Sequence, residues 1–160
     1  MLNMKLKGLI EEDAINYKKT SMFLIFPFCS FKCNLEAGCQ VCQNSTLASA
    51  PILNISVDTI VDRYIKNDLT HAIVMAGLEP FDSFDELLEL VKALREATQD
   101  DCVIYTGYTE EECQSKIDIL KHYPNIIVKF GRFRPGEKSH YDEVLGIYLI
   151  SSNQYAKVIS

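Results

Sequence analysis

Apolar runs typical of β-strands alternate with amphipathic helical patterns from residue 22 onward, and this alternation constrains the fold more than any other feature. Strands separated by helices indicate βαβ units, in which the consecutive strands run parallel in one sheet. The expected strands are residues 22–28, 71–76, 102–106, 125–130 and 145–150, and the expected helices are residues 57–67, 84–97 and about 109–122.

Each expected helix has a signal for its first turn. Ser56 is a plausible N-cap for the first helix. The second and third follow Ser-x-x-Glu and Thr-x-x-Glu patterns, which predict capping boxes formed by Ser83 with Glu86 and by Thr109 with Glu112. These signals fix where the helices should begin.

The chain length limits how such units can be arranged. With 160 residues, the chain is expected to form one domain, residues 1–160. A closed barrel of eight βα units needs about 200 residues or more. We therefore expect an α/β fold that is either a partial (β/α) barrel or an open, mostly parallel sheet, with ligands bound at the carboxyl ends of the strands.

Charge and hydropathy exclude several classes of protein. The formal net charge is -6 and the pI is about 5.1, which argues against a nucleic-acid-binding module. The longest apolar run, Met22 to Cys29, is far too short to span a membrane. The N-terminus becomes acidic before any long apolar stretch, unlike a signal peptide. We expect a cytoplasmic protein with no nucleic-acid or membrane partner.

Four of the six cysteines lie close together, at Cys29, Cys33, Cys39 and Cys42. In a reducing compartment such clustering indicates a metal or redox centre more than a disulfide. Four thiolates could hold zinc, although zinc ribbons usually place two Cys-x2-Cys pairs far apart. Alternatively, three thiolates could hold a 4Fe-4S cluster and leave one iron open for a ligand. The polar residues between the cysteines argue against a buried core segment.

Three short motifs directly follow expected strands. The cysteine run follows the first, AGLEP (residues 76–80) follows the second, and YTGY (residues 105–108) lies at the end of the third. Because parallel strands end at the same edge of a sheet, these motifs should converge there.

Together these motifs resemble a known family. Cys29-x3-Cys33 followed by Cys42-x-Asn44 resembles the Cys-x3-Cys-x2-Cys signature of radical SAM enzymes. AGLEP resembles the Gly-Gly-Glu-Pro loop of that superfamily. The stretches YTGYTEEE, GRF (residues 131–133) and SSNQ (residues 151–154) resemble, in order, motifs of the activating proteins of anaerobic (class III) ribonucleoside-triphosphate reductase. The similarity runs from about residue 22 to residue 159.

The resemblance implies three cluster ligands within a cluster loop, residues 29–44. These are Cys29, Cys33 and Cys42, because Cys42 is followed after one residue by Asn44, as in the family pattern. Six residues are then inserted between the second and third ligands. Cys39 falls in this insertion and is a possible alternative ligand.

The resemblance also implies a reaction. S-adenosylmethionine would bind the open iron, and its reductive cleavage would give a 5′-deoxyadenosyl radical that removes hydrogen from a glycine. The implied partners are the large subunit of anaerobic ribonucleotide reductase and an electron donor such as a flavodoxin. The residues that this assigns to the cofactor site are Asn44, Gly77, Glu79, Tyr105, Thr106, Gly107, Tyr108 and Asn153, with Gln154 beside them.

The chain departs from the family pattern at several positions. Leu78 replaces the second glycine of the Gly-Gly-Glu-Pro loop, which requires a shifted loop or a negative φ. Phe130 replaces the acidic residue before Gly-Arg-Phe. Two other functions are therefore retained as alternatives: activation of a different glycyl radical enzyme, and a non-catalytic zinc-binding interaction module. Cys102 and Cys113 are expected to be packing thiols.

Overall fold

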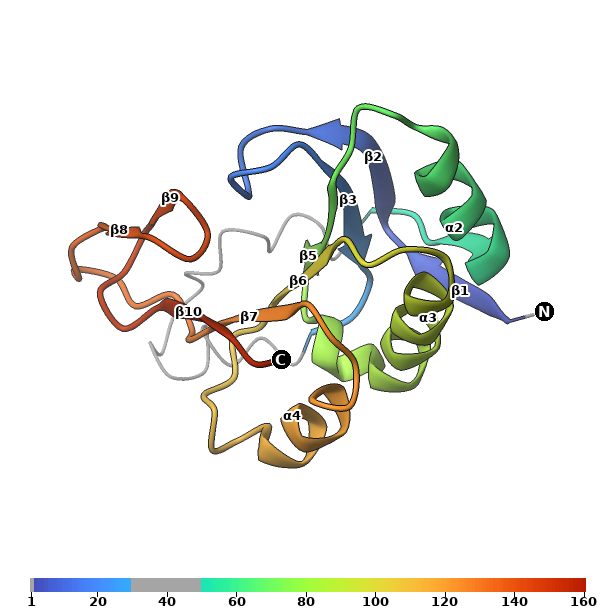
Figure 1. The fold of residues 1–160 in the computed structure, drawn as a ribbon. Helices are drawn as coiled ribbons and strands as arrows, with labels where there is room; N and C mark the ends of the chain where they lie inside the picture. Colours follow the sequence, from blue (N-terminus) through green and yellow to red (C-terminus); the bar gives the residue numbers. More distant parts are fainter. Residues whose placement is uncertain (1, 30–49) are drawn as a thin grey trace.

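The computed structural model describes residues 2–29 and 50–160 and is built on one six-stranded sheet (Figure 1). The strand order is β10-β7-β6-β5-β3-β2. The strands are β2 (Gly8–Asp13), β3 (Ser21–Phe26), β5 (Ala72–Gly77), β6 (Asp101–Tyr105), β7 (Ile126–Phe130) and β10 (Tyr155–Val158).

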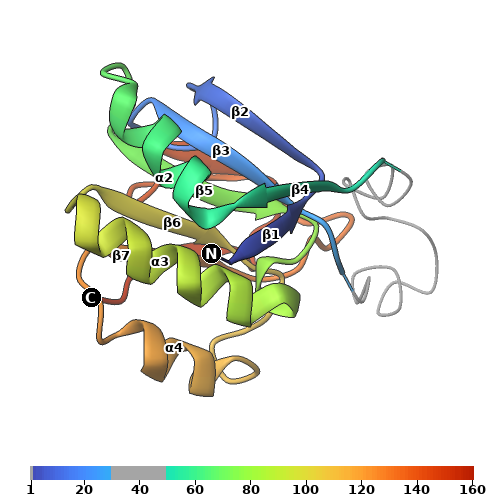
Figure 2. The same cartoon turned by 90° about the vertical axis from the view of Figure 1, so that its right-hand side faces the viewer.

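The central four strands are parallel, and each pairs with the strand of this sheet that comes next along the chain. β3 pairs with β5, β5 with β6, and β6 with β7, all in parallel register, whereas the edge strands β2 and β10 are antiparallel. Helices α2 (Val57–Lys66), α3 (Phe84–Ala97) and α4 (Gln114–Leu120) make the connections. All three cover the same face of the sheet (Figure 2), so the opposite face is left for a ligand site.

Side-chain alternation along the strands divides the interior in two. Met22, Leu24 and Phe26 of β3 pack toward the helices, as do the corresponding residues of the other parallel strands, and form the main core. Smaller side chains such as Val74, Ala76 and Val103 point to the opposite face, where they form a second cluster. The small side chains leave space on that face of the sheet.

Two short antiparallel ribbons complete the described fold. β1 (Asn3–Leu6) pairs with β4 (Leu53–Ser56), and the buried Met4 and Leu6 join the helix-side core. β8 (His140–Asp142) pairs with β9 (Ile147–Leu149) in a hairpin that places Leu145 and Leu149 against the opposite face of the sheet.

The expected α/β class and the parallel sheet are confirmed, but not every expected strand belongs to it. The run 145–150 was expected as a further strand of the βα series, and it instead contributes the short β9 to the separate hairpin. Gly146, with φ +73°, and the hydrogen bond from Leu145 N to the Asp142 carboxylate turn the chain there. The sequence analysis did not predict the edge strands β2 and β10.

The Ser56 prediction is confirmed, whereas the Thr109–Glu112 capping box forms but does not open helix α4. The Ser56 hydroxyl accepts a hydrogen bond from Thr59 N (3.1 Å). Thr109 and Glu112 bond reciprocally, each backbone N–H donating to the other side chain (2.9 and 3.3 Å), although α4 itself begins only at Gln114.

The Ser83–Glu86 capping box is wrong. Ser83 makes no side-chain cap, and its buried Oγ has no partner within the described ranges. The Glu86 carboxylate accepts from Lys5 N (2.9 Å) instead. A 3-10 turn, η2 (Pro80–Ser83), precedes α3 and is capped by the Glu79 side chain, so the chain enters α3 already turned.

Within the described residues, no helix is long and apolar enough to cross a membrane.

Candidate functional site

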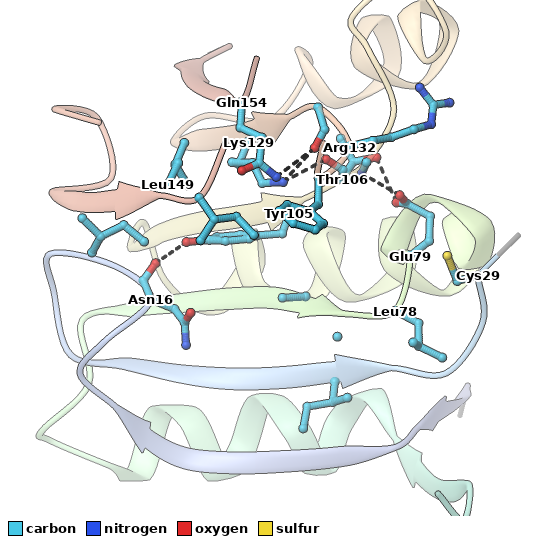
Figure 3. Close-up of a pocket in the computed structure, with 18 of the residues that line it drawn as sticks. Asn16, Cys29, Leu78, Glu79, Tyr105, Thr106, Lys129, Arg132, Leu149 and Gln154 are labelled. Atoms are coloured by element: carbon cyan, nitrogen blue, oxygen red, sulfur yellow. Dashed lines mark hydrogen bonds between the residues drawn. The ribbon is translucent and has the colours of Figure 1, made fainter. Parts of the chain in front are cut away.

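A cavity of about 330 Å³ lies on the sheet face opposite the helices, at the carboxyl ends of the parallel strands (Figure 3). Its walls come from the ends of β3, β5, β6 and β7, from the loops that follow them, and from the β8–β9 hairpin. Ligand sites in proteins typically have volumes of about 300–1,000 Å³, so this cavity can hold one small molecule.

Glu79 joins two of these loops. Its carboxylate accepts hydrogen bonds from Gly107 N (2.7 Å), Thr106 Oγ1 (2.9 Å) and Phe81 N (3.0 Å). The AGLEP and YTGY motifs therefore meet directly, as their positions after neighbouring strands predict. Thr106 Oγ1 also accepts from Tyr108 N (3.0 Å), which extends the network along the second loop.

Burial changes the acidity of Glu79. Its side chain is only 5% exposed, and desolvation raises its pKa to about 7, although the three donated hydrogen bonds act in the opposite direction. A carboxyl group in this position can change its protonation state near neutral pH.

Residue 77 must be a glycine because its backbone lies close to β3. Its φ is +87°, and a Cβ placed there would lie 2.6 Å from Ile25 Cγ2 and 2.7 Å from Phe26 N. Leu78, which follows, is not among the described residues with positive φ, in agreement with the expectation from the sequence. The loop therefore accepts Leu78 in place of the second glycine, because the backbone at residue 78 does not need a positive φ.

Lys129 is a cavity residue that the sequence analysis missed. Its side chain is 7% exposed, and its Nζ donates to Gly131 O (3.1 Å) and Thr106 O (3.4 Å). Nζ also lies 5.6 Å from the centre of the Tyr105 ring. The signal in the sequence was a lysine on the inward-facing register of an otherwise apolar strand, NIIVKF. A buried ammonium group here favours an anionic ligand group.

Tyr105 closes one end of the cavity. Its hydroxyl donates to Asn16 O (2.6 Å), which fastens the β2–β3 turn to β6 (Figure 3). Burial raises the pKa of the Tyr105 phenol, so it stays protonated.

The GRF and SSNQ motifs also meet. Asn153 Nδ2 donates to Arg132 O (2.7 Å), and Gln154 Nε2 donates to Gly131 O (3.3 Å). The Arg132 side chain turns away from the cavity, donating to the Glu112 carboxylate (2.6 Å) and lying over the Tyr108 ring. These residues support the cavity wall.

The predicted site residues therefore fall into two groups. Gly77, Glu79, Tyr105, Thr106 and Gly107 line the cavity, and so does Gln154. Tyr108 and Asn153 lie behind the lining and hold it in place.

Of the four clustered cysteines, Cys29 is described, and it lines the cavity next to Leu78 and Glu79 (Figure 3). The predicted ligands Cys33 and Cys42, the alternative Cys39, and Asn44 lie outside the described residues. Within the described ranges, no group of three metal-binding side chains occurs.

The two remaining cysteines are buried packing residues, as expected. Cys102 is fully buried, and desolvation raises the pKa of its thiol to about 12. Burial raises the pKa of the Cys113 thiol to about 11, and its Sγ donates to Thr109 O. Both thiols lie in the helix-side core and neither lines the cavity.

Comparison with known families agrees with this geometry. The family model of the 4Fe-4S single cluster domain matches residues 19–155, which is most of the chain. The chain belongs to this family. No curated protein matches it.

The Cys29 thiol at this edge of the sheet is of the ligand type that a 4Fe-4S cluster requires. Thiolates are the protein ligands of such clusters, and Cys29 presents its thiol to the cavity. Cys29 thus places a thiol beside a ligand-sized cavity.

Proposed function

We propose that this 4Fe-4S protein is a radical SAM activating enzyme that binds S-adenosylmethionine in the cavity and generates a glycyl radical on the large subunit of anaerobic ribonucleotide reductase. One observation carries the proposal: AGLEP, YTGY, GRF and SSNQ, which are far apart in the sequence, surround one cavity that also contains Cys29.

The cluster would be held by Cys29, Cys33 and Cys42, leaving one iron open. When bound, it would supply one electron to the sulfonium of S-adenosylmethionine, giving the 5′-deoxyadenosyl radical that takes hydrogen from the substrate glycine. The chain's own task is to bind, to orient and to exclude water.

The lining residues suit such a ligand. The Lys129 ammonium favours a carboxylate, and Glu79 is the sole carboxylate among the described lining residues. Glu79 holds the loops after β5 and β6 in place through Thr106 and Gly107. The apolar side chains of β3 and of the β8–β9 hairpin enclose the remainder of the cavity and exclude water from it.

Radical SAM enzymes have a partial (β/α) barrel, and the sheet supports this finer description. Its parallel strands follow one another in chain order with every described helix on one face. A loop of a protein substrate could then reach the open face. The proposal includes a cytoplasmic site of action and reduction by a separate electron donor.

The test is anaerobic reconstitution with iron and sulfide, reduction with dithionite, and measurement of 5′-deoxyadenosine formed from S-adenosylmethionine. Wild type and Cys113→Ala should form it, and Cys29→Ala should not. If Cys39→Ala loses the cluster while Cys33→Ala or Cys42→Ala keeps it, the ligand assignment is wrong.

Addition of the reductase large subunit then tests the partner. A glycyl radical detected by electron paramagnetic resonance supports this substrate. Cleavage of S-adenosylmethionine without that radical would point to another glycyl radical enzyme. A colourless protein that binds zinc and leaves S-adenosylmethionine intact would contradict the enzymatic proposal altogether.

A further inference from the structure

Strand β9 runs along the cavity on the sheet face opposite the helices. Four consecutive residues line the cavity here, Ile147, Tyr148 and Leu149 of β9 and Ile150 after them, whereas no residue of β8 does. Side chains alternate between the two faces of a strand, so a strand that met the cavity with one face would contribute only every second residue. Strand β9 therefore presents an edge to the cavity, and β8 lies on its other side (Figure 1).

The two faces of the β8–β9 hairpin have different surroundings. Leu149 is buried against the sheet, and Ile147 packs against the same cluster. Tyr148 points the other way, because it is 71% exposed and its ring lies 5.3 Å from that of Tyr141 on β8. The hairpin thus lies flat over the sheet, with the edge of β9 beside the cavity.

The pairing within the hairpin determines which backbone groups lie on this edge. Tyr141 and Tyr148 are directly opposite each other. Their ring contact is typical of the closer kind of antiparallel pair, which exchanges no backbone hydrogen bonds. The N–H and C=O of Tyr148 therefore point away from β8 toward the cavity. Neither group bonds to a residue outside the hairpin in the described part of the chain.

Two contacts fix the hairpin in this position. The Asp142 carboxylate accepts from Ala156 N (2.9 Å), which covers a backbone group on the outer edge of β10. At the tip, Lys18 N donates to Leu145 O (2.8 Å) and joins the hairpin to the turn between β2 and β3. The edge of β9 is thus held in place, and it has no strand partner among the described residues.

We propose that the free edge of β9 binds the protein substrate by strand addition, in which an extended segment around the substrate glycine pairs with Tyr148 as a third strand of the hairpin. The inference rests on the proposed function, because it concerns how the glycine reaches the cavity. Unpaired N–H and C=O groups on a strand edge match the backbone of another extended chain.

This arrangement also suits a glycine. Alternate residues of an added strand would face the cavity, and one of them must approach the bound ligand closely. A residue without a side chain permits that approach. Because β9 is short, the added strand can make only a few hydrogen bonds, and the binding is therefore reversible, as release of the activated partner requires.

Backbone methylation of the substrate tests the pairing directly. The probe is a synthetic peptide with the sequence around the glycine of the reductase large subunit, added to the oxidised, cluster-containing protein with and without S-adenosylmethionine. Fluorescence anisotropy measures its affinity. Because a paired strand directs alternate N–H groups to its neighbour, N-methylation at every second position should weaken binding about tenfold. The intervening positions should tolerate the methyl group. Equal losses at all positions, or no binding of the unmethylated peptide, would overturn the proposal.

Two variants of one residue give the matched comparison on the protein. Tyr148→Pro removes the N–H that points to the cavity, and proline is tolerated on a strand edge whose N–H faces away from the partner strand. Tyr148→Ala keeps this N–H and removes the ring. Tyr148→Pro should bind the peptide about tenfold more weakly than Tyr148→Ala does. Equal affinities of the two variants would contradict the pairing.

Hydrogen exchange of the wild-type protein needs no variant. The Tyr148 amide lies on the free edge and should exchange at least about tenfold more slowly when the peptide is bound. If S-adenosylmethionine alone gives the same protection, the edge binds the small ligand and the proposal fails. Protection that excludes residues 147–150 would place the substrate elsewhere.

The outcomes separate this inference from the proposed function. Dithionite-driven cleavage of S-adenosylmethionine without the peptide tests the proposed function alone. If cleavage occurs but the alternating effect of N-methylation is absent, the function stands and strand addition is rejected. If there is no cleavage but the alternating effect is present, the function is wrong and the edge of β9 still binds an extended chain.

Discussion

Glu79 is held at the boundary between two loops by three hydrogen bonds from Phe81, Thr106 and Gly107. Because all three partners are donors, the arrangement suits a carboxylate that accepts. Burial nevertheless disfavours the charge and raises the pKa to about 7. The protein therefore bears a free-energy cost when Glu79 ionises.

This cost predicts a pH-dependent stability. The folded pKa lies above the value of 4.5 for an unperturbed glutamic acid, so the folded state binds more protons than the unfolded state between these values. The contribution of Glu79 is greatest below pH 4.5 and is lost as the pH rises through about 7. We expect it to lower the free energy of unfolding by about 2.5 kcal/mol between pH 5 and pH 8.

Urea unfolding of wild type and Glu79→Gln at several pH values measures this effect. The free energy of unfolding of wild type, relative to that of Glu79→Gln, should fall by about 2.5 kcal/mol between pH 5 and pH 8, because the glutamine does not titrate. Glu89→Gln, at an exposed position paired with Lys92, should follow the wild-type profile. Parallel profiles for wild type and Glu79→Gln would show that Glu79 ionises normally.

Lys129 predicts the charge of the ligand. Lys129→Met keeps much of the side-chain volume but removes the ammonium that lies 3.1 Å from Gly131 O. We expect the affinity for S-adenosylmethionine to fall at least about tenfold, or about 1.4 kcal/mol, in equilibrium binding to the cluster-containing protein. Lys92→Met, on the exposed face of α3, should bind as wild type does. If Lys129→Met binds S-adenosylmethionine as tightly as wild type does, the carboxylate of the ligand does not bind at Lys129.

At the scale of elements, the end of β5 is fixed by its contact with β3. Gly77 has a positive φ and packs against the Ile25 and Phe26 backbone, so Gly77→Ala combines conformational strain with a collision. We expect it to lower the free energy of unfolding by about 2–4 kcal/mol.

Gly136 gives the matched control for this prediction. It has a similar φ of +84°, but a Cβ there would meet nothing within 4 Å. Gly136→Ala should therefore cost about 1–2 kcal/mol, which is the conformational term alone. Equal costs in denaturant unfolding would mean that the contact between β5 and β3 is not tight.

The helix starts offer another comparison. Thr109→Ala removes a hydroxyl that accepts from Glu112 N and should cost about 1 kcal/mol. Ser83→Ala removes a buried hydroxyl without a partner in the described part of the chain and should change the stability by less than about 0.5 kcal/mol. Thermal unfolding of both variants tests whether Thr109→Ala is the more destabilising change. A larger loss of stability for Ser83→Ala would indicate that Ser83 caps α3 after all, as the sequence predicted.

At the scale of the whole molecule, the cavity depends on segments from both ends of the chain. Asn16 closes it through Tyr105, and the 151–154 turn holds its wall through Arg132 and Gly131. A ligand that binds there stabilises the whole fold, because the unfolded chain has no such site.

We therefore expect S-adenosylmethionine at 100 times its dissociation constant to raise the free energy of unfolding by about 2.7 kcal/mol in the cluster-containing protein. Cys29→Ala should lose this effect at the same ligand concentration, and Cys113→Ala should keep it. Measurement of the unfolding midpoint with and without ligand tests both. Equal stabilisation of Cys29→Ala would show that the ligand does not need the cluster.

The sequence by itself determined the α/β class, the parallel sheet and the edge at which the motifs meet. Strand and helix periodicities are local, and parallel strands necessarily end on one side of a sheet. The contact between Glu79 and Gly107 follows from that geometry.

Only the tertiary structure decided which of these residues line the cavity. Tyr108 and Asn153 lie behind the lining, Lys129 enters it, and Gly77 serves the contact with β3. The antiparallel edges β2 and β10 were also decided at this level. The physical reason is that side-chain direction and edge pairing depend on packing between segments distant in the sequence, which no local pattern records.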